Sequence, residues 1–169
     1  SVKARDRQIL KYARSALGEK KSDVKRAIEA ADEALRLFRQ MLVDEGEKTL
    51  AALEPGEFAV VMAGRPYHND SFINHDVAKH FRRLGIPVLD LDSLPGLAQV
   101  DLGIFMMETN NVFHSRLLAA GYLAAQNPYL ELVQIVSFGC GHDAVLSDEL
   151  VRVMAEAGGK SPLILKLDE

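Results

Sequence analysis

Two segments of the 169-residue chain concentrate the residue types that bind ligands. The first is AGRPYHNDSFINHD, residues 63–76, and the second is SFGCGHD, residues 137–143. In the first segment, Arg65 is able to hold a phosphate or a carboxylate through two parallel hydrogen bonds, with Tyr67 and His68 as one wall of the site. Roles as turn formers or helix starts explain the other polar or conformationally restricted residues of this segment equally well: Pro66, Asn69, Asp70, Asn74 and His75.

The second segment places Cys140 between Gly139 and Gly141, where the chain has unusual conformational freedom. The segment opens a predicted helix, whose unpaired N–H groups and positive dipole end favour an anion or a thiolate. We therefore expect the Cys140 thiol to be more reactive than a buried one. In the structural alternative, Ser137 and Asp143 cap the helix, the glycines form a tight turn and Cys140 fills space.

The elements that position these segments alternate between strand and helix patterns. Strands are predicted at 58–63, 86–91, 130–136 and 162–167, and helices at 74–85, 114–126 and 144–157. Residues 92–112 give no clear pattern. The alternation predicts an α/β fold: an open, Rossmann-like, mostly parallel sheet of about four strands in the order 2-1-3-4. In that order the first and third strands are neighbours, so the loops at 64–70 and 137–143 meet at the carboxyl edge of the sheet.

An N-terminal helical arm precedes the sheet. Apolar residues recur at three- and four-residue steps between Val24 and Leu42, and a shorter stripe ends at Gly18. Glu54-Pro55-Gly56 separates the arm from the remainder, so we predict a helical arm at 1–55 and a Rossmann-like domain at 56–169. The arm begins in mid-pattern, which favours a chain excised from a larger multidomain protein.

Composition narrows the classes of function. The first 26 residues hold nine basic and three acidic side chains, which indicates either a solvated helix face or a surface for an acidic partner. No aromatic residues interleave with these bases, so nucleic acid is not an expected partner. The single cysteine excludes an internal disulfide and a closed multi-cysteine metal site, and no stretch resembles a membrane span or a secretory signal. The expected location is the cytoplasm.

The standard catalytic and nucleotide-binding motifs are missing from the sequence. It contains no GxGxxG fingerprint, no Walker loop, no GxSxG elbow and no HExxH. Function must therefore come from side chains that the fold assembles.

Several segments together resemble a domain of the CoA-substrate-specific enzyme activases, relatives of 2-hydroxyacyl-CoA dehydratase and its activator. They are AGRPYHNDSFINHD, HSRLLAAGYLAAQNPYLELVQIVSFGCGHDAVLSDEL and the C-terminal ILKLDE, all within residues 58–169. The helical arm carries no motif of this resemblance. The matching portion resembles the part of these proteins that is labelled uncharacterised.

The resemblance implies a setting of ATP-dependent, low-potential electron transfer. Its parent would combine an actin-like ATPase that carries an iron–sulfur cluster with dehydratase-like modules, and neither ATP nor a cluster is expected on the isolated chain. Cys140 is the candidate metal ligand, completed by ligands from other domains. Carried over by motif, the ligand-binding residues are Gly64, Arg65, Pro66, Tyr67, His68, Asn74, His75, Arg116, Ser137, Phe138, Gly139, Gly141 and Asp143.

Three hypotheses follow for the function of the chain. In the first, it binds an anionic ligand such as an acyl-CoA, or contributes to an iron–sulfur site, between loops 64–70 and 137–143. In the second, it is a non-catalytic scaffold that docks against other domains of the parent. In the third, it is a thiol enzyme that uses Cys140 with His142 or His68; no substrate-binding motif accompanies this third hypothesis.

Overall fold

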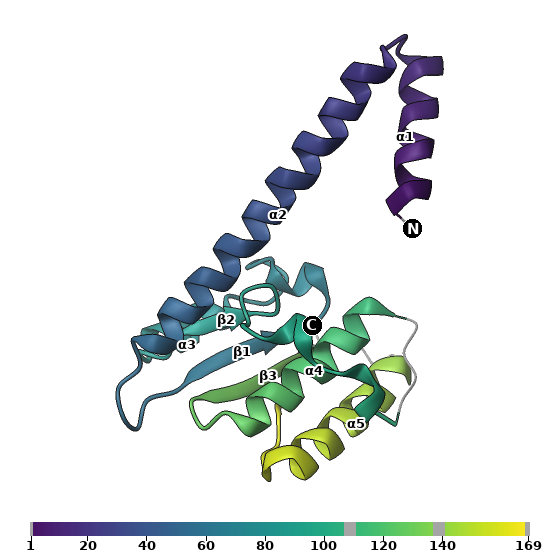
Figure 1. Cartoon of the computed structure of the whole chain (residues 1–169). Coiled ribbons are helices and arrows are strands. Elements are labelled where there is room, and N and C mark those ends of the chain that lie inside the picture. The colour runs from purple at the N-terminus through teal and green to yellow at the C-terminus, as the bar shows by residue number, and fades with distance from the viewer. Residues whose placement is uncertain (1, 107–110, 137–140, 168–169) are drawn as a thin grey trace. The chain divides into compact units, whose positions relative to one another are not determined.

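A computed structural model describes residues 2–106, 111–136 and 141–167, except the side chain of His142. It divides into two compact units, Ser1–Leu42 and Val43–Glu169. The first unit is a helical hairpin and the second is an α/β unit (Figure 1). No helix of the described segments is long and apolar enough to span a bilayer.

The hairpin consists of helix α1 (Val2–Ala16) and the first two thirds of helix α2 (Lys21–Ala51). Gly18 allows the tight connection, because its φ of 70° lies in the left-handed region. The two helices diverge from this turn (Figure 1), and an apolar groove of about 520 Å³ lies between them. Its apolar lining comes from both predicted stripes: Ile9, Ala13, Val24, Ala27, Ile28 and Ala31.

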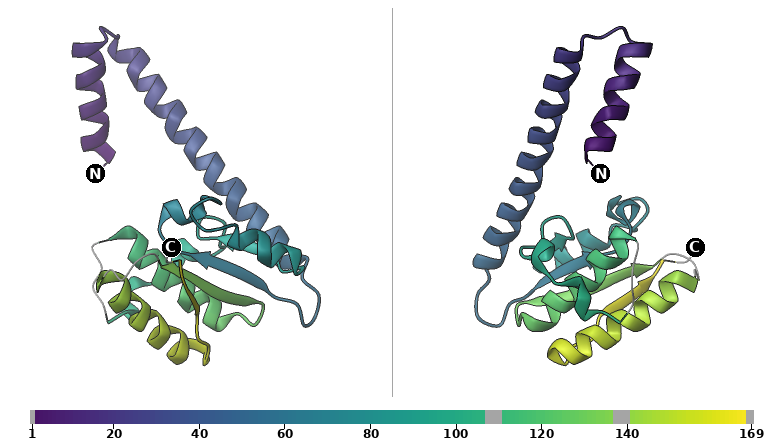
Figure 2. Two further views of the ribbon diagram at one scale, coloured as in Figure 1. Left: turned by 180° about the vertical axis from the view of Figure 1, so that it is seen from behind. Right: turned by 45° about the vertical axis from the view of Figure 1, so that its right-hand side comes forward.

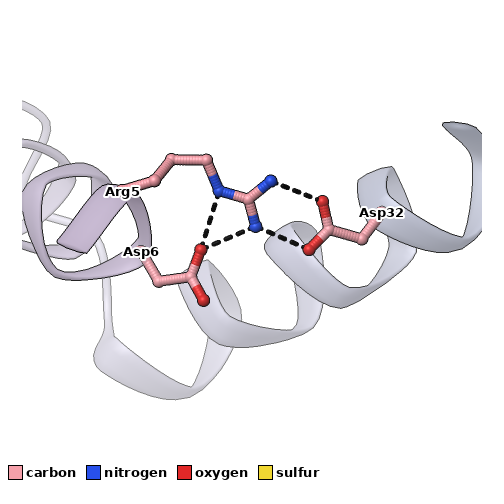
Figure 3. A network of polar contacts seen from close by, with 3 residues as sticks. All are labelled: Arg5, Asp6 and Asp32. Carbon is pink, nitrogen blue, oxygen red and sulfur yellow. Dashed lines mark hydrogen bonds and ion pairs between the residues drawn. The ribbon is translucent and has the colours of Figure 1, made fainter. Parts of the chain in front are cut away.

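One charged cluster joins the two helices of the hairpin (Figure 3). The guanidinium of Arg5 donates two hydrogen bonds to Asp32 on α2, at 2.8 and 2.6 Å, and two to Asp6 on α1. Hydrogen bonding to Arg5 lowers the pKa of Asp32. Because all three groups are exposed to solvent, this cluster fixes the orientation of the side chains more than it stabilises the fold.

The α/β unit is built on a four-stranded parallel sheet in the order β2-β1-β3-β4. The strands are β1 (Ala59–Ala63), β2 (Val88–Asp90), β3 (Leu130–Val136) and β4 (Leu163–Lys166). The fold class and the strand order 2-1-3-4 predicted from the sequence are confirmed. β1 and β3 are the central strands, and nearly all of their residues are buried.

Helices cover both faces of the sheet (Figures 1 and 2). Helix α3 (Val77–Arg83) packs on one face, against Val60 and Met62 of β1. Helices α4 (Val112–Gln126) and α5 (Gly141–Gly158) pack on the other face and form the larger core. The connection from β1 to β2 therefore uses one face, and the connections to β3 and β4 use the other. In parallel α/β sheets, ligands bind at the carboxyl edge where the chain reverses in this way.

Two elements differ from the sequence-based expectation. The helix predicted at 74–85 begins only at Val77, because His75 and Asp76 have φ values of 52° and 60°, outside the helical region. The strand predicted at 86–91 is reduced to β2, since Pro87 lacks the N–H that a ladder requires. The described part of the connection between β2 and α4 contains two short 3₁₀ turns, η2 (Leu97–Gln99) and η3 (Leu102–Ile104).

The packing of α4 against α5 gives a test of this core. A methyl group on Gly158, the last residue of α5, would lie 1.9 Å from the backbone oxygen of Ala125 in α4. Because a backbone oxygen cannot rotate away, we expect Gly158→Ala to lower the free energy of unfolding by about 1–3 kcal/mol. Chemical denaturation measures this change.

The matched control is Gly141→Ala at the first residue of the same helix. Apart from its chain neighbours and the backbone of its own helix, no atom of the described residues lies within 4 Å of the added methyl group there, so we expect a change below about 1 kcal/mol. Equal stability of the two variants would contradict close packing between the ends of α4 and α5.

Candidate functional site

An ion pair joins the two segments singled out in the sequence. The Nη2 atom of Arg65 donates a 2.8 Å hydrogen bond to Oδ1 of Asp143, across 78 residues of sequence. Arg65 follows β1 by two residues, and Asp143 lies in the first turn of the helix that follows β3. A carboxylate there is also stabilised by the positive end of the α5 dipole. The pair thus lies at the carboxyl ends of the two central strands.

Burial differs between the two partners of this pair. The side chain of Asp143 is 10% exposed, whereas that of Arg65 is 36% exposed. The cation is therefore the member of the pair that solvent, or a ligand, can approach.

His68 fixes the backbone from which Arg65 projects. The backbone N–H of Arg65 donates to Nδ1 of His68 at 3.0 Å, and the backbone N–H of His68 donates to the carbonyl oxygen of Arg65 at 2.8 Å. A side chain on Gly64 would clash with this arrangement, because its Cβ would lie 2.5 Å from Nδ1. Gly64 is thus required by the close approach of the His68 ring.

The environment of His68 keeps its ring neutral. Only 2% of the residue is exposed, and Nδ1 accepts a hydrogen bond, so the ring proton lies on Nε2. Burial is the main cause that lowers the pKa of His68, and the positive charge of Arg65 lowers it further, whereas Asp143 opposes the shift. Among the predicted site residues, His68 therefore supports Arg65.

Two neighbours hold the loop around His68. The side-chain amide of Asn74 donates to the carbonyl oxygen of His68 at 2.8 Å, and the ring of Tyr67 contacts the imidazole edge to face, with centroids 4.4 Å apart. Asn74 is buried, and its Oδ1 has no hydrogen-bond partner among the described residues. Pro66 begins the 3₁₀ turn η1 (Pro66–Asn69), which brings Tyr67 and His68 back toward Arg65.

A small hollow lies behind the ion pair, between β3, α4 and α5. Arg65 and Asp143 line it, together with Leu117, Leu146 and the buried Gln134. The interpretation of the sequence treated the strand LELVQIV as uniformly structural and missed Gln134. The signal was present, since a glutamine inside an otherwise apolar buried strand is unusual.

The remaining predicted residues lie in several places. Arg116 on α4 is hydrogen-bonded to Asp92 at 2.5 Å, and His75 is exposed in the loop before α3. Gly141 is the first residue of α5. Four of the predicted residues lie outside the described parts of the chain: Ser137, Phe138, Gly139 and Cys140.

Metal-binding side chains do not gather in the described parts of the chain. The described segments contain no group of three or more His, Cys, Asp or Glu side chains arranged to hold a metal ion. A [4Fe–4S] or [2Fe–2S] cluster normally takes four thiolates, whereas the whole chain has one cysteine. The residues of this site therefore do not fit a cluster held by this chain alone.

The described side chains at this edge of the sheet include groups that can hold a ligand. They combine a guanidinium, a carboxylate, a buried neutral imidazole and two buried amides, at a point where parallel α/β sheets bind ligands. In this cluster no described serine, cysteine or lysine is positioned as a nucleophile.

The depressed pKa of His68 gives a prediction for pH dependence. The unfolded state takes up a proton near the ordinary histidine value of 6.5, whereas the folded state resists it, so protonation favours unfolding. We expect the free energy of unfolding to fall as the pH drops from about 7 to about 5, and His68→Asn to reduce this slope. Urea denaturation at a series of pH values measures it.

His80→Asn is the control, because His80 is exposed on α3. Its slope should match that of the wild type. An unchanged slope in His68→Asn would show that His68 is not held neutral by the fold.

Comparison with known proteins places the chain in a family. The searches of curated proteins and of solved structures give no match. A family model described as CoA enzyme activase uncharacterised domain (DUF2229) matches residues 2–94, which include both helices of the hairpin. The arm, which carried no motif of the resemblance, is thus part of the matched region, and residues beyond 94 are outside it. The match covers more than half of the sequence, and the chain belongs to the CoA enzyme activase uncharacterised domain family.

Proposed function

We propose that the α/β unit binds an anionic ligand at the carboxyl ends of β1 and β3, between loops 64–70 and 137–143. The observation that carries this proposal is the ion pair between Arg65 and Asp143. It positions a partly exposed guanidinium beside the first turn of an 18-residue helix, where backbone N–H groups and the helix dipole also favour negative charge. The family description makes CoA or an acyl-CoA the first ligand to test.

Asp143 acts in this proposal as an internal substitute for the ligand. Its carboxylate occupies the hydrogen-bonding direction of Arg65 that a phosphate or carboxylate of the ligand would use. An incoming anion therefore competes with Asp143 for the guanidinium, or bridges the guanidinium and the N–H groups of the helix.

Membership of the family supports a proposal for the cellular role. We propose that the domain works in an ATP-dependent redox system of the activase and 2-hydroxyacyl-CoA dehydratase type, in the cytoplasm, alongside other domains of its parent. The site is proposed for an anionic ligand rather than a cluster, because its described side chains carry a cation and no thiolate.

A scaffold function is the second candidate, and the hairpin favours it. Its groove is lined mainly by apolar side chains, and Phe38 and Met41 extend the apolar stripe with exposed fractions of 57% and 65%. Large apolar side chains exposed in this way are typical of surfaces that contact another protein. In this candidate, the loops at the sheet edge serve packing against a neighbouring domain.

Titration of the chain with CoA, and separately with inorganic phosphate, tests the binding proposal by isothermal titration calorimetry. We expect Arg65→Gln to weaken binding by about tenfold or more, because a charge-assisted hydrogen bond is lost. We expect Asp143→Asn to strengthen binding, since it removes the competing charge and keeps the size of the side chain.

Arg82→Gln is the matched control, because Arg82 is an exposed arginine in the last turn of α3. Its affinity should stay within about twofold of the wild-type value. If the wild-type chain binds neither probe, or if Arg65→Gln binds as tightly as the wild type, the anion site is refuted and the scaffold candidate stands.

A further inference from the structure

Helix α2 carries an apolar repeat along one side. Its members follow one another at alternating steps of four and three residues: Val24, Ile28, Ala31, Leu35, Phe38 and Leu42. This spacing, a mean of 3.5 residues, is the one that packs one helix along another in a coiled coil. We call this row of side chains the seam of α2, and it is suited to contact with another helix along its whole length.

Helix α1 covers only the first part of the seam. Val24, at its start, is 7% exposed, and Arg5 of α1 is bonded to Asp32 of α2 (Figure 3). Farther along α2, Leu35 and Phe38 are 44% and 57% exposed. Two large apolar side chains at consecutive positions of the repeat therefore face solvent in the hairpin. Such a surface is typical of contact with another protein chain.

The two edges of the exposed part of the seam differ in charge. Asp32 and Arg39 each directly follow a member of the repeat and are seven residues apart, so they lie on the same edge. Both are exposed. The opposite edge carries Ala34 and Met41, which are uncharged and also seven residues apart. A partner that fits this surface must bring a cation to Asp32 and an anion to Arg39.

A second copy of α2 in antiparallel orientation fits the apolar part of the surface. A two-fold axis that passes between Leu35 and Phe38 places Phe38 of the second copy against Leu35 of the first. It also places the large Leu42 of each copy against the small Ala31 of the other. Large and small side chains thus alternate along the contact, which favours close packing of the two helices.

The same two-fold rotation matches the charges. It brings the same edge of the two helices together, so that Arg39 of each copy lies beside Asp32 of the other. The bond between Arg5 and Asp32 is compatible with this contact. Arg5 uses one hydrogen bond on each oxygen of the carboxylate, and each oxygen has a second lone pair for Arg39 of the second copy.

We propose that α2 pairs with α2 of a second copy of this chain, antiparallel, through the seam from Ala31 to Leu42. The charges favour a second copy over an unrelated acidic helix. Although the hairpin as a whole is basic, an acidic helix would bring like charge to Asp32, whereas a second copy brings Arg39. This surface belongs to the hairpin, so the inference does not depend on the anion site of the α/β unit.

Sedimentation equilibrium of the whole chain tests the pairing. Because the contact is short, we expect a monomer–dimer equilibrium between about 1 and 100 μM. Phe38→Ser should raise the dissociation constant by about tenfold or more, since a large apolar side chain is lost from the centre of the contact. Leu37→Ser is the matched control. Leu37 is 48% exposed on the same helix but is not a member of the repeat, so the dissociation constant should stay within about twofold of the wild-type value.

Charge reversal tests the antiparallel orientation. Arg39→Glu and Asp32→Lys should each weaken dimerisation by about tenfold, because each change puts like charges together at two places in the dimer. An equimolar mixture of the two variants should dimerise more tightly than either variant alone, since both charged contacts of the mixed dimer join opposite charges. Loss of the bond to Arg5 does not explain such a gain, because Asp32→Lys lacks that bond both alone and in the mixture.

Three outcomes would overturn the inference. The first is a wild-type chain that stays monomeric over the whole concentration range. The second is a dimer that Phe38→Ser leaves unchanged, because the copies would then meet elsewhere. The third is a mixture of the charge variants that dimerises no better than its components, which would exclude the antiparallel pairing. Should circular dichroism show that Phe38→Ser does not fold, the two charge variants still decide, since both side chains are exposed.

Discussion

The side-by-side pairing of β1 and β3 is the constraint on which the α/β unit depends. Five residues of β1 pair in parallel with five of β3, and parallel strands bring their carboxyl ends to the same edge. The chain leaves this edge toward opposite faces of the sheet, to α3 after β1 and to α5 after β3. Residues 78 positions apart, Arg65 and Asp143, come within hydrogen-bonding distance as a consequence.

Buried polar side chains gather at the carboxyl edge of the same two strands. In the interior of the sheet, burial is stabilising because the side chains are apolar, as in Val61, Leu118 and Leu132. Toward the carboxyl edge, His68, Asn74, Gln134 and Asp143 are buried as well. Each such group loses hydration, and hydrogen bonds offset that cost. His68 and Asp143 both accept hydrogen bonds from Arg65, and Asn74 donates one to the carbonyl oxygen of His68. These bonds connect the two loops at this edge of the sheet.

The fold could be predicted well from the sequence, because the spacing of apolar residues indicates which side chains are buried. The run LELVQIV is buried on both faces, as expected for a central parallel strand, and it forms β3 over the predicted residues. The start of α3 was less predictable, because His75 and Asp76 both have positive φ values. The periodicity of apolar residues does not indicate such a backbone conformation. The site was harder to predict than the fold, and His68 shows why. Its ring is buried because it packs against Gly64, and the sequence alone does not reveal that contact.

The hairpin, unlike the α/β unit, leaves many of its apolar side chains exposed. Among its described apolar residues, Ala13 and Val24 are buried, while Phe38 and Met41 remain largely exposed. Two helices cannot enclose a core by themselves, so most of their apolar surface stays in contact with solvent or with a partner. Residues 1–42 carry 11 Lys and Arg against 6 Asp and Glu, whereas the rest of the chain is strongly acidic.

The family match includes the hairpin as well as part of the α/β unit. It runs from the first helix of the hairpin through β2, and so includes Arg65 and excludes Asp143. The hairpin is therefore a regular part of the family's sequence and not an incidental extension. The Arg65–Asp143 pair therefore joins a part of the chain that the family model describes to a part that lies outside the matched residues.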